Sequence, residues 1–311
     1  MPTQVFEDAN WPRAKAWLAG ERSFATLGKL AVIGAPLRLG SIIAGRTDLA
    51  PQAVREILAK FSCYDVEADV DLSLLEARDF GDLNLAELRL EEVFEPLSKV
   101  VQHALKSFNA VILLGGNNGV TRPGCQGAAK SLKSCGLLTF DAQFDLRDLG
   151  GGLSNENSVR ALLADGLPGG NIVQLGIQSF ATSRVYTQIA WEAGITFVTM
   201  QQIREQGIEG VVRNALDQLA KHVETIYVDF DLSVLDRAFA PACSGSRPGG
   251  LTPWELKRAA WLCGNHPKVR VLDLVEVDPT QDLSEITVMT TAACFLAFAA
   301  GLLSRLIGVG K

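Results

Sequence analysis

The feature that most constrains the fold of this chain is a repeated pattern, in which a short apolar run leads directly into oxygen-bearing side chains. The run at 136–140 leads into the sequence DAQFD at 141–145, and the runs at 110–114 and 225–228 lead into GGNN and DFD. Short apolar runs bounded by turn residues are typical of buried strands. Open α/β sheets bind their ligands beyond the carboxyl ends of the strands. The three segments are therefore predicted to line one shared pocket.

Four aspartates are expected to meet in that pocket: Asp141, Asp145, Asp229 and Asp231. Carboxylates crowded in this way repel one another unless cations neutralise them or some of them keep a proton. Two explanations follow. Either the pocket binds a metal cation, or it is free of metal and is stabilised by protonated acids, amides and nearby arginines such as Arg122 and Arg147.

The rest of the chain alternates strand-like runs with helical segments of about ten to fifteen residues, which is typical of a parallel sheet. We predict an α/β protein, namely a doubly wound three-layer α-β-α sandwich with a mainly parallel sheet. No linker, repeat or low-complexity stretch divides the chain. The sequence is therefore interpreted as one domain over residues 29–311, preceded by an N-terminal arm at 1–28 that Trp11 and Trp17 would anchor.

Strands are expected at 30–35, 66–82, 110–114, 136–140, 171–178, 196–200, 225–228 and 269–277. Helices are expected near 11–18, from 50, at 91–108, 123–134, 159–164, 184–193 and 209–220, from 252, and at 286–306.

Composition narrows the functional classes. Hydrophobic residues make up 48% of the 311, which is enough for a sizeable core, and a net charge of −6 without a basic run argues against a nucleic-acid partner. The six cysteines have no zinc-ligand spacing, and residues 1–10 lack the features of a signal peptide, so we expect reduced thiols in a cytoplasmic protein. The apolar stretch at 292–303 is shorter than the ~20 residues that span a bilayer. It is predicted to be a buried helix rather than a membrane segment.

Three motifs together resemble those of the ureohydrolase family, which includes arginase, agmatinase and formimidoylglutamase. The segment at 115–118 is similar to the family's Gly-Gly-Asp-His block, and 141–145 is similar to its Asp-Ala-His-x-Asp block. The segment at 229–237 resembles the Asp-x-Asp-x-x-x-x-Asp-Pro block, and 153–160 is most similar to the formimidoylglutamase-like branch. The resemblance covers roughly residues 30 to 305, and it implies an arginase-like fold.

The resemblance also implies a reaction, the hydrolysis of a non-peptide C–N bond in a linear amidine or guanidine, with a nucleophile that two Mn²⁺ ions supply. Carried over by position, the first ion would be held by Asn118, Asp141, Asp145 and Asp229. The second would be held by Asp141, Gln143, Asp229 and Asp231.

Two further roles follow from the same resemblance. Asp145 and Glu276 would be the catalytic residues, and Glu276 would also bind the substrate amidinium as a carboxylate–cation pair. Asn155 and Arg160 would contact the far end of the substrate. The family resemblance further implies a homo-oligomer, either a trimer or a hexamer.

The chain departs from the family pattern where two metal-binding histidines are expected. Asn118 and Gln143 stand at those positions, and the three histidines of the chain, His103, His222 and His266, lie outside the motifs. An all-oxygen shell suits Mn²⁺, Mg²⁺ or Ca²⁺ better than zinc or copper.

Two functions remain open at this point. One is a hydrolase that acts on a formimidoylglutamate-like or guanidino small molecule with an atypical oxygen-rich metal site. The other is a catalytically inactive, metal-free homologue that serves as a ligand-binding or regulatory subunit.

Overall fold

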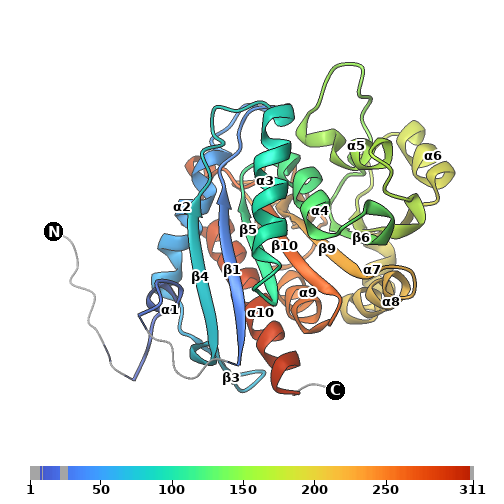
Figure 1. Cartoon of the computed structure of the whole chain (residues 1–311). Coiled ribbons are helices and arrows are strands. Elements are labelled where there is room, and N and C mark those ends of the chain that lie inside the picture. Colours follow the sequence, from blue (N-terminus) through green and yellow to red (C-terminus); the bar gives the residue numbers. More distant parts are fainter. Residues whose placement is uncertain (1–7, 9, 22–26, 309–311) are drawn as a thin grey trace.

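One eight-stranded sheet forms the centre of the protein, in a computed structural model that describes residues 8, 10–21 and 27–308 (Figure 1). Its strand order is β4-β1-β5-β10-β9-β6-β7-β8, and every neighbouring pair is parallel. The strands of this sheet are β1 (Gly28–Ala35), β4 (Leu75–Asp82), β5 (Ala110–Gly115), β6 (Cys135–Phe140), β7 (Ile172–Ile177), β8 (Thr196–Thr199), β9 (Thr225–Asp231) and β10 (Val269–Val275). A separate antiparallel pair consists of β2 (Tyr64–Asp65) and β3 (Val70–Asp71).

Helices cover both faces of the sheet. Side chains alternate between the two faces along a strand, so each apolar run supplies two separate parts of the core. Leu30 and Ile112 pack with α1, α2, α7, α8, α9 and α10 on one face, and Ile33 and Val111 pack with α3, α4, α5 and α6 on the other. The helices are α1 (Ala14–Leu18), α2 (Ala50–Ile57), α3 (Leu90–Ala104), α4 (Thr121–Ala128), α5 (Ser158–Ala164), α6 (Arg184–Ala193), α7 (Met200–Gln206), α8 (Ile208–Ala220), α9 (Pro253–Asn265) and α10 (Ile286–Ile307). The three-layer α-β-α sandwich predicted from the sequence is confirmed.

Some element boundaries differ from expectation. The strand expected to end at residue 228 continues to Asp231, so that Asp229 and Asp231 belong to β9 itself. Helix α7 was not expected, and α4 ends at Ala128 instead of residue 134. Helix α7 begins at a capping box formed by Thr199 and Gln202, which is a local helix-start signal in the sequence.

The N-terminal region is partly described. Trp17 in α1 is buried and donates its indole N–H to the carbonyl of Leu75 at 2.8 Å, whereas the side chain of Trp11 is half exposed. The predicted anchoring therefore holds for Trp17 and not for Trp11. Residues 1–7, 9 and 22–26 of the proposed arm lie outside the described residues, and the division at residue 28 stays a prediction.

Helix α10 is the longest helix of the described residues. The helix has 22 residues and is longer than the apolar stretch predicted at 292–303. By length and composition alone it could cross a membrane. Most of the helix is nevertheless buried against α9 and the sheet. The prediction of a buried helix is confirmed, although the reason is its packing and not its length.

Candidate active site

The carboxyl ends of β5, β6, β9 and β10 meet in the middle of the sheet, and their following residues build the candidate site. Gly116, directly after β5, lies so close to the chain at Leu37 that a Cβ atom there would be 1.9 Å from the Leu37 carbonyl oxygen. Only glycine allows this approach. It fixes the start of the loop that carries Asn117 and Asn118 into the site.

Asn118 connects three of these strand ends. Its side-chain amide donates to the carboxylate of Asp145, and its backbone N–H donates to Oε1 of Glu276 at 2.7 Å. The hydroxyl of Ser158 in α5 donates to its carbonyl oxygen at 2.8 Å. Asn118 is 1% exposed, so these hydrogen bonds are shielded from water and hold the residue in one position.

The aspartates on β6 and β9 are linked through Ser233. The Ser233 hydroxyl donates to Oδ1 of Asp141 at 2.9 Å, and its backbone N–H donates to Oδ1 of Asp231 at 2.7 Å. The backbone N–H of Gln143 donates to the same Asp141 oxygen at 2.8 Å. All four predicted aspartates are buried, and the charges of Asp141 and Asp231 lie near enough to act on both Asp145 and Asp229.

A second hydrogen-bond network lies directly beneath the site and was not predicted. Asp273 of β10 accepts from the hydroxyl of Tyr227 at 2.5 Å and from that of Thr121 at 2.9 Å. The Thr121 hydroxyl also lies 3.4 Å from Oδ1 of Asp229 and contacts the side-chain oxygen of Asn118. The signal in the sequence was a lone aspartate inside the apolar run of β10, which a fully buried strand tolerates only with hydrogen-bond partners.

Burial raises the pKa of every acid in the site. The pKa of Asp141 rises to about 7, mainly through desolvation and then through the nearby charge of Glu276. Desolvation is also the largest cause for Asp145, Asp229 and Asp231, each of whose pKa values lies well above the usual range, and the neighbouring acids add to it. The pKa of Glu276 is raised by burial as well.

No salt bridge joins these acids to a cation within the described part of the chain. Arg122 forms a bidentate pair with Asp165, and Arg147 pairs with Glu156. Arg122 therefore does not balance the site, because its partner Asp165 is not part of the cavity lining, whereas Glu156, the partner of Arg147, is itself a lining residue. The four aspartates and Glu276 thus form no salt bridge among the described residues.

Two of these acids also have an unusual backbone. Asp145 (φ 51°) and Glu276 (φ 67°) adopt the left-handed conformation, which costs a residue other than glycine about 1–3 kcal/mol. Both accept a hydrogen bond from Asn118. Backbone strain of this kind is typical of functional sites, where the surrounding contacts hold it.

A small cavity of about 60 Å³ opens onto this cluster. Its lining includes Gln143, Asp145, Asn155, Asp231 and Glu276, together with Cys243 and Arg247 from the loop after β9. The Asn155 amide donates to Oε1 of Glu276 at 3.0 Å and accepts from the backbone N–H of Ile42 at 3.0 Å.

Arg160 is placed differently from the other predicted residues. It lies in α5 and is not part of the cavity lining, and its backbone N–H donates to the carbonyl of Asp145 at 3.0 Å. The three histidines lie at or beyond the carboxyl ends of α3, α8 and α9, and none of them lines the cavity.

The donor chemistry of the cluster fits a divalent cation. Carboxylate and amide oxygens are the hard ligands that Mn²⁺, Mg²⁺ and Ca²⁺ prefer, and a cation would relieve the repulsion that raises the pKa values. Among residues 8, 10–21 and 27–308, no three His, Cys, Asp or Glu side chains form a ready-made cage. In this structure the amide nitrogen of Asn118 faces Asp145, and its side-chain oxygen accepts from the Thr121 hydroxyl.

Comparison with known proteins defines the class to which this fold and site belong. The family model "Arginase family" matches residues 28–300, and the chain therefore belongs to the arginase family. It is 34% identical to formimidoylglutamase from Halalkalibacterium halodurans over 303 residues, covering 93% of each chain.

Solved structures agree with this assignment. The crystal structure of formimidoylglutamase from Bacillus subtilis matches with a TM-score of 0.89 at 26% identity, covering 97% of this chain and 95% of that one. Trypanosoma cruzi formiminoglutamase, solved with Mn²⁺, shares the fold with a TM-score of 0.85 at 23% identity, covering 95% and 99%.

Proposed function

We propose that this protein is a ureohydrolase that cleaves the C–N bond of a linear amidine, with a formimidoylglutamate-like compound as its substrate. The proposal rests on five buried acids at neighbouring strand ends: Asp141, Asp145, Asp229, Asp231 and Glu276. None of them forms a salt bridge with a cation among the described residues. An amidinium is a planar cation that such a cavity would attract. Similarity to formimidoylglutamase over 93% of both chains supports the substrate class.

The residues that would hold divalent ions are Asn118, Asp141, Gln143, Asp145, Asp229 and Asp231. Ions bound there would act as Lewis acids and would lower the pKa of a water molecule to give a nucleophile near neutral pH. Mn²⁺ is the first candidate, because the related Trypanosoma cruzi protein was solved with it. The oxygen-rich donor set keeps Mg²⁺ and Ca²⁺ as alternatives.

The acids of the chain would then divide the remaining work. Glu276, held by the Asn118 N–H and the Asn155 amide, would accept hydrogen bonds from the substrate amidinium. Asp145, which is also one of the residues that would hold an ion, would accept a proton from the attacking water as a carboxylate and pass it to the leaving nitrogen. Asn155 and Arg160 would bind the far end of the substrate, where a carboxylate would suit the arginine.

One observation favours the second candidate, a metal-free homologue that binds a ligand without hydrolysing it. Asn118 stands at a position where the family pattern has histidine, and its amide already satisfies Asp145 by a direct hydrogen bond. Such a contact stabilises the carboxylate without a metal. The two candidates differ in metal content and in turnover.

Elemental analysis and an activity assay on the same purified protein test the proposal. After dialysis against Mn²⁺ and removal of the excess, we expect about two Mn per chain and release of glutamate from N-formimidoyl-L-glutamate. The double variant Asn118→His with Gln143→His should bind Mn²⁺ more tightly, because imidazole is the better transition-metal ligand. Gln201→His, on the exposed surface of α7, is the matched control and should change neither property.

The contrary result is equally clear. If the parent binds no metal and has no activity, while the double variant gains both, the natural site is degenerate and the protein is the non-catalytic homologue. We further expect a homo-oligomer, as family resemblance implies, and a cytoplasmic location, as the cysteine pattern and the N-terminal sequence suggest.

A further inference from the structure

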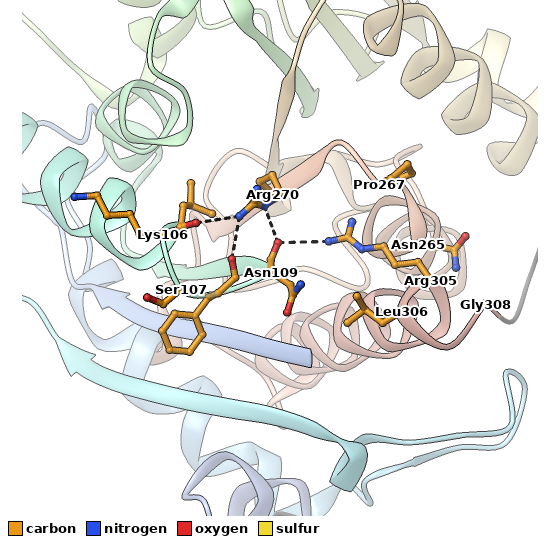
Figure 2. A pocket seen from close by; sticks show the side chains of 11 residues that line it. Lys106, Ser107, Asn109, Asn265, Pro267, Arg270, Arg305, Leu306 and Gly308 are labelled. Carbon is orange, nitrogen blue, oxygen red and sulfur yellow. Dashed lines mark hydrogen bonds between the residues drawn. The ribbon is translucent and has the colours of Figure 1, made fainter. Parts of the chain in front are cut away.

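A second cavity lies at the opposite end of the sheet from the candidate site (Figure 2). Its volume is about 680 Å³, and it lies where β5 and β10 begin, between the turn after α3 and the carboxyl ends of α9 and α10. Strands of six or seven residues separate the two cavities, a distance of roughly 20 Å. The residues that line it are therefore separate from those proposed for catalysis.

Two arginines dominate this second cavity, and both donate to the same oxygen atom. Nε of Arg270 lies 2.7 Å from the carbonyl oxygen of Asn109, and Nη2 of Arg305 lies 3.5 Å from it. Figure 2 shows the two guanidinium groups approaching this carbonyl from different elements, β10 and α10. Two positive groups are thus held close together at one side of the cavity.

The remaining hydrogen bonds of the two arginines also go to backbone carbonyls. Nη2 of Arg270 donates to the carbonyls of Leu105 and Phe108 at 3.1 and 2.9 Å. Nη1 of Arg305 donates to that of Val269 at 3.0 Å and to that of His266. Carbonyl groups are neutral dipoles, so these bonds fix the positions of the guanidinium groups without balancing their charge.

No carboxylate in the described part of the chain compensates the pair. Neither arginine forms a salt bridge, and the lining contains no Asp or Glu but adds Lys106. Burial lowers the pKa of both arginines, and the charge of Arg270 helps to lower the pKa of Arg305 to about 10. Nη1 of Arg270 and Nε of Arg305 have no hydrogen-bond partner among the described residues.

We propose that this cavity binds the oxyanion group of a small metabolite, a carboxylate or a phosphate, on Arg270 and Arg305. Planar guanidinium groups with spare N–H donors match both oxyanions. Asn265 and Ser107 add polar groups to the lining, and the volume is that of a small-molecule site. A bound anion would supply the negative charge that the surroundings of the two arginines lack.

Calorimetric titration of the full-length protein with inorganic phosphate and, separately, with L-glutamate tests this proposal. We expect saturable binding of at least one of them below about 10 mM. The unfolding temperature should rise by about 4 °C when the ligand is at 100 times its Kd. A response to phosphate alone identifies a phosphate site, and a response to glutamate alone identifies a carboxylate site.

Variants locate the binding. Arg305→Gln should weaken it at least about tenfold by removing one charged hydrogen-bond donor, while Arg204→Gln, which removes an arginine that donates to a backbone carbonyl far from the cavity, should leave it unchanged. Ser107→Asp places a carboxylate in the lining and keeps both arginines, and it should abolish binding by repelling the anion. This variant tests the proposal even if Arg305→Gln fails to fold. Arg160→Gln, which removes the arginine proposed to bind the substrate carboxylate in the candidate active site, should retain binding.

Two results would overturn the proposal. One is the absence of saturable binding of either anion up to about 10 mM in the folded parent protein. The other is binding that survives Arg305→Gln and Ser107→Asp but disappears in Arg160→Gln, which would assign it to the candidate active site.

Discussion

At the scale of single residues, the site depends on Asn118, which stands where the family pattern predicted a histidine. Asn118 contacts Asp145 and Glu276 and shares the Thr121 hydroxyl with Asp273. An amide can donate and accept at once, and it therefore stabilises a cluster of acids whether or not a metal is bound. This double capacity lets the Asn118 side chain link Asp145 to the Thr121 hydroxyl.

Glu276 offers a prediction with a matched control. Glu276→Gln should lower kcat/KM by roughly 100-fold or more, because a neutral amide cannot pair with the substrate amidinium. The unfolding temperature should be unchanged or higher, since a buried carboxyl with a raised pKa is removed. Glu285 has the same left-handed backbone but is exposed and pairs with Lys60, so Glu285→Gln should leave kcat/KM unchanged. An equal loss of activity in both variants would refute the assignment.

The pH dependence of stability follows from Asp141. Its pKa is about 7 in the folded protein against 3.8 as the ordinary value, so between these limits the folded state keeps a proton that the unfolded chain has lost. The free energy of unfolding of chelator-treated protein should therefore fall as pH rises from about 4 to about 7. Differential scanning calorimetry across this range measures it.

Metal should reverse this trend. Mn²⁺ competes with protons for the carboxylates, so it should raise the unfolding temperature more at pH 8 than at pH 6. Asp141→Asn should reduce both the slope with pH and the response to Mn²⁺. Equal stabilisation at the two pH values would contradict a site formed by these acids.

At the scale of elements, close helix contact explains how the apolar helix α10 is accommodated. A Cβ atom on Gly301 would lie 2.1 Å from the Trp261 carbonyl oxygen of α9, and one on Gly264 would lie 2.1 Å from that of Phe298. The two glycines let the helices approach backbone to backbone. α10 is thereby packed into the core on one face of the sheet.

Alanine substitutions test this helix contact. Gly301→Ala should destabilise the protein by about 1–3 kcal/mol, because the new methyl group overlaps the backbone of α9. Gly210→Ala in α8, where a Cβ atom meets nothing within 4 Å, should stabilise it by about 0.5–1 kcal/mol through helix propensity. Urea unfolding of both variants measures the difference. A neutral Gly301→Ala would mean that the two helices separate easily.

At the scale of the whole molecule, the parallel sheet separates two kinds of chemistry. The carboxyl ends of its strands gather acids in a small cavity, and the amino ends of β5 and β10 gather arginines around a larger one. A parallel sheet aligns the carboxyl ends of all its strands on one side, so residues far apart in the chain meet there. The amino ends of the same strands are aligned on the opposite side, where the second cavity lies.

Assembly is the prediction that belongs to this scale. If the chain forms the expected homo-oligomer, light scattering should give three or six times the mass of one chain. Val185 and Trp191 of α6 are 63% and 66% exposed, and burial between subunits would remove this apolar surface from water. Val185→Glu with Trp191→Glu should then dissociate the assembly, whereas Val66→Glu, at another exposed apolar position, should not. A monomeric parent would exclude the oligomer.

The sequence by itself determined the parallel three-layer fold, the family and the strand ends at which a site was predicted. Local patterns are sufficient for these, because buried strands and the motifs that follow them are continuous in the chain. The tertiary structure decided what lies between segments: the Asn118–Asp145 contact, the partners of Arg122 and Arg147, and the network around Asp273. Such contacts join residues as many as 152 positions apart, and only packing sets which side chains meet.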